Sequence, residues 1–477
     1  MGRGGRGRPR RPARPAGGWL RPVRGGTVRR QTPADEAPAS EAPPSPVTPQ
    51  AVPPQEPPPR GSGRLLLDRL YGPFWAGKLL STAGIWVHNV VSAIVTYQIS
   101  RSTLMVGAVS IVQFAPQLLF APISGAQADR GDPRRQLVLG RLLAASGSLG
   151  LAGAIAVLGV EGLPGAWPLL VAAAIVGVGF VVGGPAMHAL LPTLVRPNEL
   201  PAAVALSHLP PTLARSGGPV LGAFLLVTVG PAWAFAFTGI TNLVFAAVIV
   251  ALPIRWRARE QQPGGGTVRE GLRYLRSDPA VAFLLLGVLA LGFGADPVVT
   301  LTPELSDGFG RGEQLVGIFA SAFGLGAAVV FPLLKVLRAR VGLSHLGTLG
   351  LSCVAGGLFV TAAAPVPAVA IVGMALGGVG FSFALTGLTT ALYEQVPEGF
   401  RGRIMALWSM AFLGSRPVAA AVNGGVADLT SVEGAFLAAG GVVVVIAALA
   451  VVGGRRAGGR AAATAATATS AAGSGGA

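Results

Sequence analysis

The chain is divided into apolar segments of about twenty residues, separated by short polar breaks. About twenty apolar residues in a helix match the thickness of the hydrocarbon core of a bilayer. The pattern predicts twelve membrane-spanning helices, at 74–99, 103–126, 135–159, 165–191, 201–229, 232–254, 280–303, 314–337, 343–363, 367–393, 402–426 and 433–453. We therefore expect an all-α, polytopic membrane protein.

The composition agrees with this class of protein. Hydrophobic residues make up 51% of the 477 positions and charged residues only 12%, which is typical of a chain solvated by lipid. The single cysteine, Cys353, allows no disulfide framework, and the four histidines are scattered. We find no nucleotide-binding loop, no paired carboxylates and no nucleophile triad, so the sequence predicts no enzyme and no cofactor.

The net charge of +17 comes from basic residues in the tails and in alternate breaks, without the aromatic-laced basic face of a nucleic-acid binder. Cationic loops stay on the cytoplasmic side of a membrane, so the distribution predicts that both termini are cytoplasmic. The odd-numbered breaks hold only Arg101 and Arg311. The even-numbered breaks and the C-terminal tail hold Arg130, Arg134, Arg135, Arg141, Arg196, six arginines from Arg255 to Arg276, Lys335, Arg338, Arg340, Arg401, Arg403, Arg455, Arg456 and Arg460.

The longest internal break divides the spans six and six. The sequence thus predicts five regions: a disordered basic and proline-rich tail, a six-helix bundle, a cytoplasmic linker, a second six-helix bundle and a disordered tail, at 1–70, 71–254, 255–279, 280–455 and 456–477. The tetrad at 177–180, Gly-Val-Gly-Phe, recurs at 378–381 in the matching span of the second half. This match in order and spacing favours two homologous halves.

The break after the second span runs from Gly125 to Arg135 and places Asp129 and Arg130 before a second pair of basic residues, Arg134 and Arg135. Such a loop is often only a cytoplasmic connection between two spans, with basic residues that follow the positive-inside rule. However, a glycine, then Asp-Arg, then a further glycine and paired arginines resembles the signature of the major facilitator superfamily. The resemblance extends over residues 70 to 455, and it implies the major facilitator fold and secondary transport.

The resemblance also implies roles for this loop. In that family the loop aspartate is thought to contact the cytoplasmic start of span eleven, so Asp129 is expected near Arg401, Gly402 and Arg403. Within the superfamily the chain resembles the macrolide-efflux and enterobactin-exporter-like branch. The stretches that carry this resemblance are 198–222, 268–275 and 401–406.

Span five carries a motif of small residues, Gly218, Pro219 and Gly222, after Arg215. The resemblance implies an exporter motif that seals the cavity, whereas small residues in membrane helices usually mean tight packing. The pair Pro210-Pro211 removes two backbone donors and predicts a broken helix.

A few charged and polar residues lie inside the predicted spans. Each charge there costs about 2.5–3.5 kcal/mol on insertion scales and needs a reason. For Arg215 and Arg416 we favour packing against backbone carbonyls over a role in substrate binding. For Asp296 a proton carrier and a position at the outer rim are equally weighted. His88 and Asn89 are candidate site residues on a helix that, by the resemblance, faces the cavity, although a histidine with satisfied hydrogen bonds in the core is the more common case.

These features predict a proton-coupled exporter of small amphipathic molecules in a bacterial cell membrane, acting by alternating access and functional as a monomer. Its partners would be the small-molecule substrate, protons and membrane lipid, with no nucleic acid and no metal. An importer of a small metabolite and a lipid flippase share the same fold and stay open as alternatives.

The predicted topology is tested with reporters of membrane sidedness. Reporters fused after Arg276 and after Arg460 are expected to report the cytoplasm, because arginine-rich segments flank both sites. One placed near Gly310 is expected to report the outside. An outside signal at Arg276 would contradict the division into six and six spans.

Overall fold

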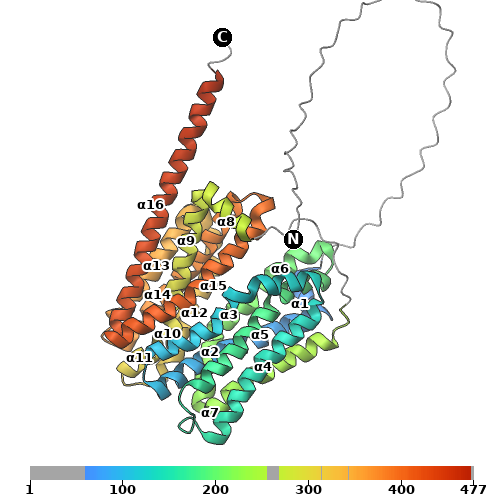
Figure 1. The fold of residues 1–477 in the computed structure, drawn as a ribbon, viewed down its shortest axis with the longest axis vertical. Coiled ribbons are helices and arrows are strands. Elements are labelled where there is room, and N and C mark those ends of the chain that lie inside the picture. The colour runs from blue at the N-terminus through green and yellow to red at the C-terminus, as the bar shows by residue number, and fades with distance from the viewer. Residues whose placement is uncertain (1–59, 255–267, 313, 342, 474–477) are drawn as a thin grey trace, which may run out of the picture. The chain divides into compact units, whose positions relative to one another are not determined.

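The computed structural model describes residues 60–254, 268–312, 314–341 and 343–473, and residues 56–477 form one compact unit. Figure 1 shows long helices packed side by side. The main helices are α2 (Tyr71–Ser100), α3 (Thr103–Arg130), α4 (Pro133–Leu158), α5 (Trp167–Leu190), α7 (Leu209–Ala251), α12 (Gln314–Val341), α13 (Leu343–Ala362), α14 (Pro367–Gln395), α15 (Glu398–Leu429) and α16 (Val432–Gly473). Shorter elements are α1 (Ser62–Leu66), two 3-10 turns (Leu191–Thr193, Pro197–Glu199), α6 (Leu200–Ser207), α8 (Val268–Ser277), α9 (Pro279–Ala295), α10 (Pro297–Thr300) and α11 (Thr302–Gly308).

Nine helices within the described residues are long and apolar enough to cross a membrane. One of these segments, Pro197–Ala251, contains two long helices in succession. Gly230 adopts φ 84° and ψ 171° and interrupts α7 there, between the predicted spans five and six. Two further apolar segments, 103–117 and 315–330, are shorter. The chain is thus a multi-pass helical membrane protein, and the total of twelve spans stays a prediction.

Two predicted spans are broken where prolines interrupt them. The helix that begins the fifth span ends at Ser207, and α7 begins at Leu209, just before Pro210. The seventh span is divided into α9, α10 and α11, with Pro297 and Pro303 near the starts of the second and third pieces. Proline lacks the backbone N–H that continues the helical hydrogen-bond ladder, which explains both interruptions.

The repeated glycines pack in the same way in both halves of the sequence. A Cβ atom added to Gly179 of α5 would lie 2.6 Å from the carbonyl oxygen of Gly140 in α4, and one added to Gly380 of α14 would lie 2.6 Å from that of Gly350 in α13. The backbones of these helix pairs are therefore in contact, which only a missing side chain allows. These matching contacts support the two-half organisation.

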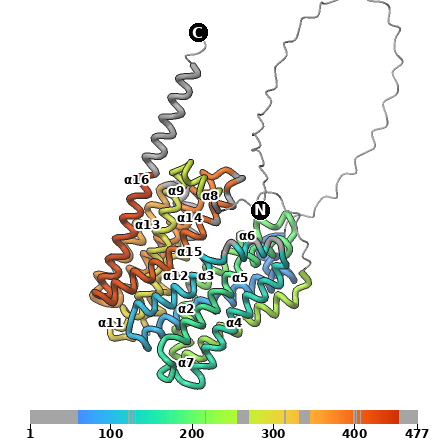
Figure 2. The backbone as a smooth tube through the Cα atoms, in the orientation of Figure 1, coloured from blue at the N-terminus to red at the C-terminus, as the bar shows by residue number. Residues whose placement is uncertain are grey.

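The first glycines of the two tetrads behave alike as well. A Cβ atom on Gly177 would overlap the carbonyl oxygen of Gln113 in α3, and one on Gly378 would overlap that of Phe323 in α12. Each tetrad thus holds one helix against two neighbours, on opposite sides. Figure 2 traces the backbone of the helices involved.

The two halves of the sequence meet along α3 with α15 and along α7 with α12. A Cβ atom on Gly107 of α3 would lie 2.5 Å from the Ala420 carbonyl oxygen, and one on Gly424 of α15 would lie 2.7 Å from the Cα of Leu104. Gly317 of α12 approaches Ala223 and the carbonyl of Pro219 in α7. Small residues therefore line both contacts, as expected where helices associate inside lipid.

Residues 60–70 are folded in the structure, which corrects their assignment to the disordered tail. The Nε and Nη2 atoms of Arg60 donate to Glu199 at 2.7 and 2.9 Å, and its Nη1 donates to Asp68 at 2.5 Å. Burial would raise the pKa of Asp68, but two backbone N–H groups and Arg60 bring that pKa below its ordinary value. Leu65 is fully buried. The earlier tail, residues 1–59, lies outside the described residues, as do linker residues 255–267.

The C-terminal boundary also differs from the prediction. Helix α16 continues to Gly473, past the predicted end of the twelfth span and into the region predicted as a disordered tail. The added sequence is rich in alanine, which has the highest intrinsic helix propensity. The apolar window of this helix ends at Gly453.

The backbone contacts predict the effect of a single methyl group. Gly378→Ala should place a Cβ atom on the Phe323 carbonyl and cost about 1–3 kcal/mol of stability, despite the better helix propensity of alanine. The control Gly441→Ala, whose Cβ would meet no described atom within 4 Å, should be neutral or slightly stabilising. Thermal unfolding of the purified variants in detergent checks both, and equal Tm values would contradict the packing argument.

Candidate functional site

A small cavity of about 20 Å³ lies where the two halves of the sequence meet. Two arginines reach it, Arg215 from α7 and Arg416 from α15. The rest of its lining is apolar and aromatic and comes from α2, α7, α9, α10, α12, α14 and α15: Trp86, Pro219, Ala295, Val298, Val299, Ala320, Phe323, Phe381 and Phe412. We call this space the central cavity.

Arg215 lies between two aromatic rings. Its guanidinium carbon is 4.3 Å from the ring centre of Phe381 in α14 and 5.6 Å from that of Trp86 in α2. A cation over a ring face within about 6 Å is attracted by the ring quadrupole. Phe381 belongs to the repeated tetrad, so the tetrad both packs helices and places an aromatic ring at the cavity.

Arg416 has a similar environment in the opposite half. Its guanidinium carbon is 4.8 Å from the ring centre of Phe114 in α3, and its buried Nε has no hydrogen-bond partner among the residues that the structure describes. Beside it Asn89 accepts a hydrogen bond from Gln113 at 2.8 Å. Asn89, Gln113 and Arg416 line a second small space, of about 10 Å³. The side chains of Arg215 and Arg416 therefore lie over rings, and between described residues no hydrogen bond to a backbone carbonyl supports the packing role that we favoured from the sequence.

Asp296 lies at the junction between α9 and α10, and it is 2% exposed. Its carboxylate accepts a hydrogen bond from the Nδ2 of Asn423 in α15 at 3.0 Å, and the charge of Arg416 acts on it. Asn423 is nearly fully buried, and its Oδ1 has no partner. Asp296 is thus a buried acid at a break between two helices.

His88 does not face the central cavity. It is fully buried inside the first group of helices, where its Nδ1 is 3.2 Å from the Ser148 hydroxyl of α4 and its ring packs edge-on against Phe235 of α7. Its neighbour Asn89 points to the boundary between the halves. Two adjacent helical residues point in directions about 100° apart, which lets Asn89 face the boundary while His88 faces the helices of its own half.

The glycines of span five have a packing role. A Cβ atom on Gly218 would overlap the Trp86 side chain, and one on Gly222 would lie 3.3 Å from the Cα of Val87. Both glycines therefore bring α7 against α2. Pro219, between them, lines the central cavity, so this motif also holds Arg215 and Trp86 together.

Two basic residues of the first half are buried, and one of them, Arg141, lies deeper than the sequence predicted. Arg141, assigned to a cytoplasmic break, is 2% exposed in the middle of α4, where its Nη1 donates to Ser81 at 3.2 Å and to Asn242 at 3.4 Å. Lys78 is also buried, and its Nζ donates to the Ser207 carbonyl at 2.8 Å. The two hydrogen bonds of Arg141 hold its guanidinium inside the bundle. The hydrogen bond of Lys78 satisfies the Ser207 carbonyl, which the break before α7 leaves without a helical donor.

In the loop after α3, the structure describes the side chains of Arg134 and Arg135. Arg134 donates to the carbonyls of Ile249 and Val250 at 3.1 and 2.5 Å, at the end of α7. Arg135 makes an exposed ion pair with Asp132, at 3.3 Å. Cations at the last carbonyls of a helix are stabilising, so Arg134 joins the loop to the sixth span.

The predicted contact between Asp129 and span eleven lies outside the described residues. The side chains of Asp129, Arg130 and Arg401 and the surroundings of Gly402 are outside what the structure describes. Arg403 makes an ion pair with Glu270 of α8 at 3.3 Å and stacks over Phe400 at 4.7 Å. A Cβ atom on Gly125 would meet no described atom within 4 Å, so no described residue packs closely against this glycine.

The opposite end of α3 carries a contact that sequence reasoning missed. Asp428, the penultimate residue of α15, accepts hydrogen bonds from the backbone N–H of Thr103 at 2.8 Å and of Leu104 at 3.3 Å, and from the Ser102 hydroxyl at 2.5 Å. The carboxylate thus caps the N-terminus of α3 from the other half. The Thr103 hydroxyl also donates to Glu304. We call this set of contacts the outer latch, because the arginine distribution predicts that this end faces outward.

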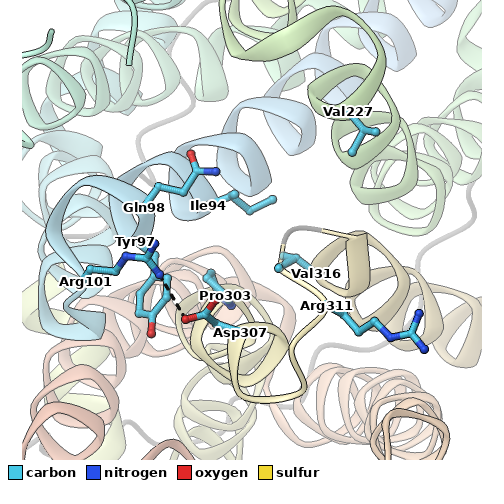
Figure 3. A pocket seen from close by; sticks show the side chains of 10 residues that line it. Ile94, Tyr97, Gln98, Arg101, Val227, Pro303, Asp307, Arg311 and Val316 are labelled. Atoms are coloured by element: carbon cyan, nitrogen blue, oxygen red, sulfur yellow. Dashed lines mark hydrogen bonds and ion pairs between the residues drawn. The ribbon is translucent and has the colours of Figure 1, made fainter. Parts of the chain in front are cut away.

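Beside the outer latch lies a cavity of about 320 Å³ between α2, α7, α11 and α12. In Figure 3, Arg101 reaches across it to Asp307, with a nitrogen to oxygen distance of 3.2 Å. Both side chains are largely exposed, at 67% and 49%. Between described residues, every hydrogen bond and ion pair that joins the two halves belongs to this end of the bundle.

Comparison with known proteins assigns the class. The family model described as transmembrane secretion effector, of the major facilitator superfamily, matches residues 66–469. The chain belongs to this family and is a membrane transporter with the major facilitator fold.

The chain is also similar to individual transport proteins, both in sequence and in structure. The chain is 28% identical over 363 residues to enterobactin exporters of Shigella boydii serotype 18 and of Escherichia coli, covering 73% of this chain and 83% of each relative. Among solved structures, a variant of the nucleoside transporter NupG superposes with a TM-score of 0.66 at 13% identity, covering 80% of this chain and 99% of that one. A POT family transporter gives 0.64 at 11% identity, covering 81% and 96%.

The outer latch leads to a prediction about the distance between the halves. Asp428→Ala should remove a helix cap of about 1 kcal/mol and shift the outer end about fivefold toward separation. Spin labels at the exposed positions Glu161 and Ser431, with Cys353 replaced, would measure this distance by double electron–electron resonance.

The matched control is Asp307→Ala, which removes an exposed ion pair at the same end. Exposed pairs contribute about 0–1 kcal/mol, so this variant should change the distance distribution less. A larger effect at Asp307 than at Asp428 would show that the cap does not hold the outer end closed.

Proposed function

We propose that this transporter exports small molecules from the bacterial cytoplasm by alternating access, driven by protons. The observation that carries the proposal is the outer latch. A carboxylate on a helix terminus joins the halves at one end through a few polar contacts, which water can replace when the halves separate. The similarity to enterobactin exporters supports the outward direction.

A second latch at the opposite end would complete the cycle. Asp129 is the penultimate residue of α3, as Asp428 is of α15, and the two helices pack side by side. In the proposed cycle Asp129 caps the start of α15, beside Arg401 to Arg403, when the inner end closes. Each helix of the pair would then supply the acid for one gate and the N-terminus for the other.

Proton coupling is assigned to Asp296. A transporter that moves a substrate uphill without ATP needs a group that changes charge, and embedded acids are the usual carriers. Asp296 is buried at a helix break, next to three lining residues of the central cavity. Asn423 donates to the ionised carboxylate, and its unpaired oxygen is available to accept from the protonated form after a side-chain flip.

The experiment compares export with and without a proton gradient. Cells with and without the gene are loaded with enterobactin or with members of a panel of fluorescent dyes, and efflux is followed with and without a protonophore. Protonophore-sensitive efflux that requires the gene is expected. Gene-dependent uptake would instead favour an importer, and lipid translocation without a soluble substrate would favour a flippase.

Asp296→Asn should abolish uphill export yet permit downhill exchange, because a permanently neutral side chain carries no proton. Reconstituted vesicles separate the two activities, with an imposed pH gradient for the first and substrate on both sides for the second. The control Asp307→Asn removes an exposed acid and should retain uphill transport. An undiminished, protonophore-sensitive gradient in Asp296→Asn would remove this residue as the carrier.

A further inference from the structure

The two arginines of the central cavity occupy matching positions in the two halves. Arg215 lies in the fifth predicted span and Arg416 in the eleventh, 201 residues apart, as are the two copies of the repeated tetrad. Both guanidiniums line the same cavity. A pair of cations at the middle of a membrane protein is costly, and an intramembrane charge is by default part of a functional site.

The positive charge of this pair is not balanced by described acids. Between described residues, neither guanidinium forms an ion pair or a hydrogen bond, and the two repel each other. Asp296 is the one described acid whose charge interacts with Arg416. One of its carboxylate oxygens already accepts a hydrogen bond from Asn423. The cavity therefore has a net positive charge even when Asp296 is ionised.

Each arginine has an aromatic partner across the boundary between the halves. Arg215 of the first half stacks on Phe381 of the second, and Arg416 of the second half stacks on Phe114 of the first. A cation over a ring is attracted by the ring quadrupole and uses no N–H group in a hydrogen bond, so the guanidinium donors stay available to an anion. The Nε of Arg416 is such an unpaired donor.

We propose that the central cavity binds a small aromatic molecule that carries an anionic oxygen group, such as a carboxylate, held between Arg215 and Arg416. This inference rests on the proposed function, since the bound molecule would be the exported substrate. The planar guanidinium fork matches a carboxylate in geometry and charge. The rings of Trp86, Phe381 and Phe412 supply the apolar surface for the aromatic part.

The volume of the central cavity determines which conformation of the protein can bind the ligand. A space of about 20 Å³ holds no aromatic molecule, so the halves must separate before the ligand enters. Separation moves each arginine away from its ring in the other half, and the anion takes the place of that ring as the partner of the cation. Without a ligand the two stacking contacts close the middle of the transporter.

The test uses a series of ligands that share a naphthyl ring and carry an anionic, a neutral or a cationic substituent. Binding of naphthoate, naphthylmethanol and naphthylmethylammonium to the purified, full-length protein in phosphatidylcholine nanodiscs is measured by calorimetry. Naphthoate should bind at least tenfold more tightly than the alcohol, and the ammonium compound more weakly than either. Decalin carboxylate, which lacks the aromatic ring, should bind more weakly than naphthoate. Equal affinity for the three naphthyl compounds would overturn the proposal without any variant.

Variants then locate the site. Arg215→Gln and Arg416→Gln should each reduce the preference for naphthoate over the alcohol at least tenfold. The matched control, Arg276→Gln, removes one positive charge at an exposed position of α8 and should leave the preference unchanged. If both cavity variants keep the preference and the wild-type Tm, the anion binds elsewhere and the proposal is wrong.

The outcome is separable from the proposed function. Selective binding of the anion without proton-driven transport would support this site and contradict the export proposal. Proton-driven export by a protein that shows no preference for the anion would do the reverse.

Discussion

The contact between α3 and α15 is the constraint on which the other inter-half contacts depend. Gly107 and Gly424 let the two backbones touch, so the two helices run side by side without intervening side chains. That approach brings Asp428 within hydrogen-bond distance of the first amides of α3. It also places Arg416 over Phe114 near the middle of the same pair. A larger residue at either glycine would displace the latch and the arginine together.

The architecture was largely predictable because lipid imposes a simple pattern. Apolar segments of fixed length indicated the class, and the repeated tetrads indicated two halves, whose glycines make matching backbone contacts. The errors arose where burial depends on tertiary contacts. Arg141 looked like a loop residue and is buried against Ser81 and Asn242. Residues 60–70 looked disordered, yet Glu199, far along the chain, fixes Arg60.

The sequence could predict those site residues whose charge is costly to bury in a membrane. That cost singled out Asp296, Arg215 and Arg416, and the structure places all three near the central cavity. It could not reveal Asn423 or Asp428, because an amide carries no charge and an acid at a helix end has no insertion penalty. Nor could it determine the direction of a side chain, and so His88 was grouped with Asn89 although only Asn89 lies at the boundary.

The strength of the contacts between the halves suits a molecule that must change state. The helix cap in the outer latch is worth about 1 kcal/mol, the exposed ion pair beside the latch is worth less, and each arginine over a ring adds about 0.5–2 kcal/mol. Such contacts hold a closed state, yet a ligand with a modest preference for the open state can overcome them. A buried ion pair between the halves would cost several kcal/mol to break. Rings as partners of Arg215 and Arg416 therefore keep the cavity closed without neutralising the charge that an anionic substrate would use.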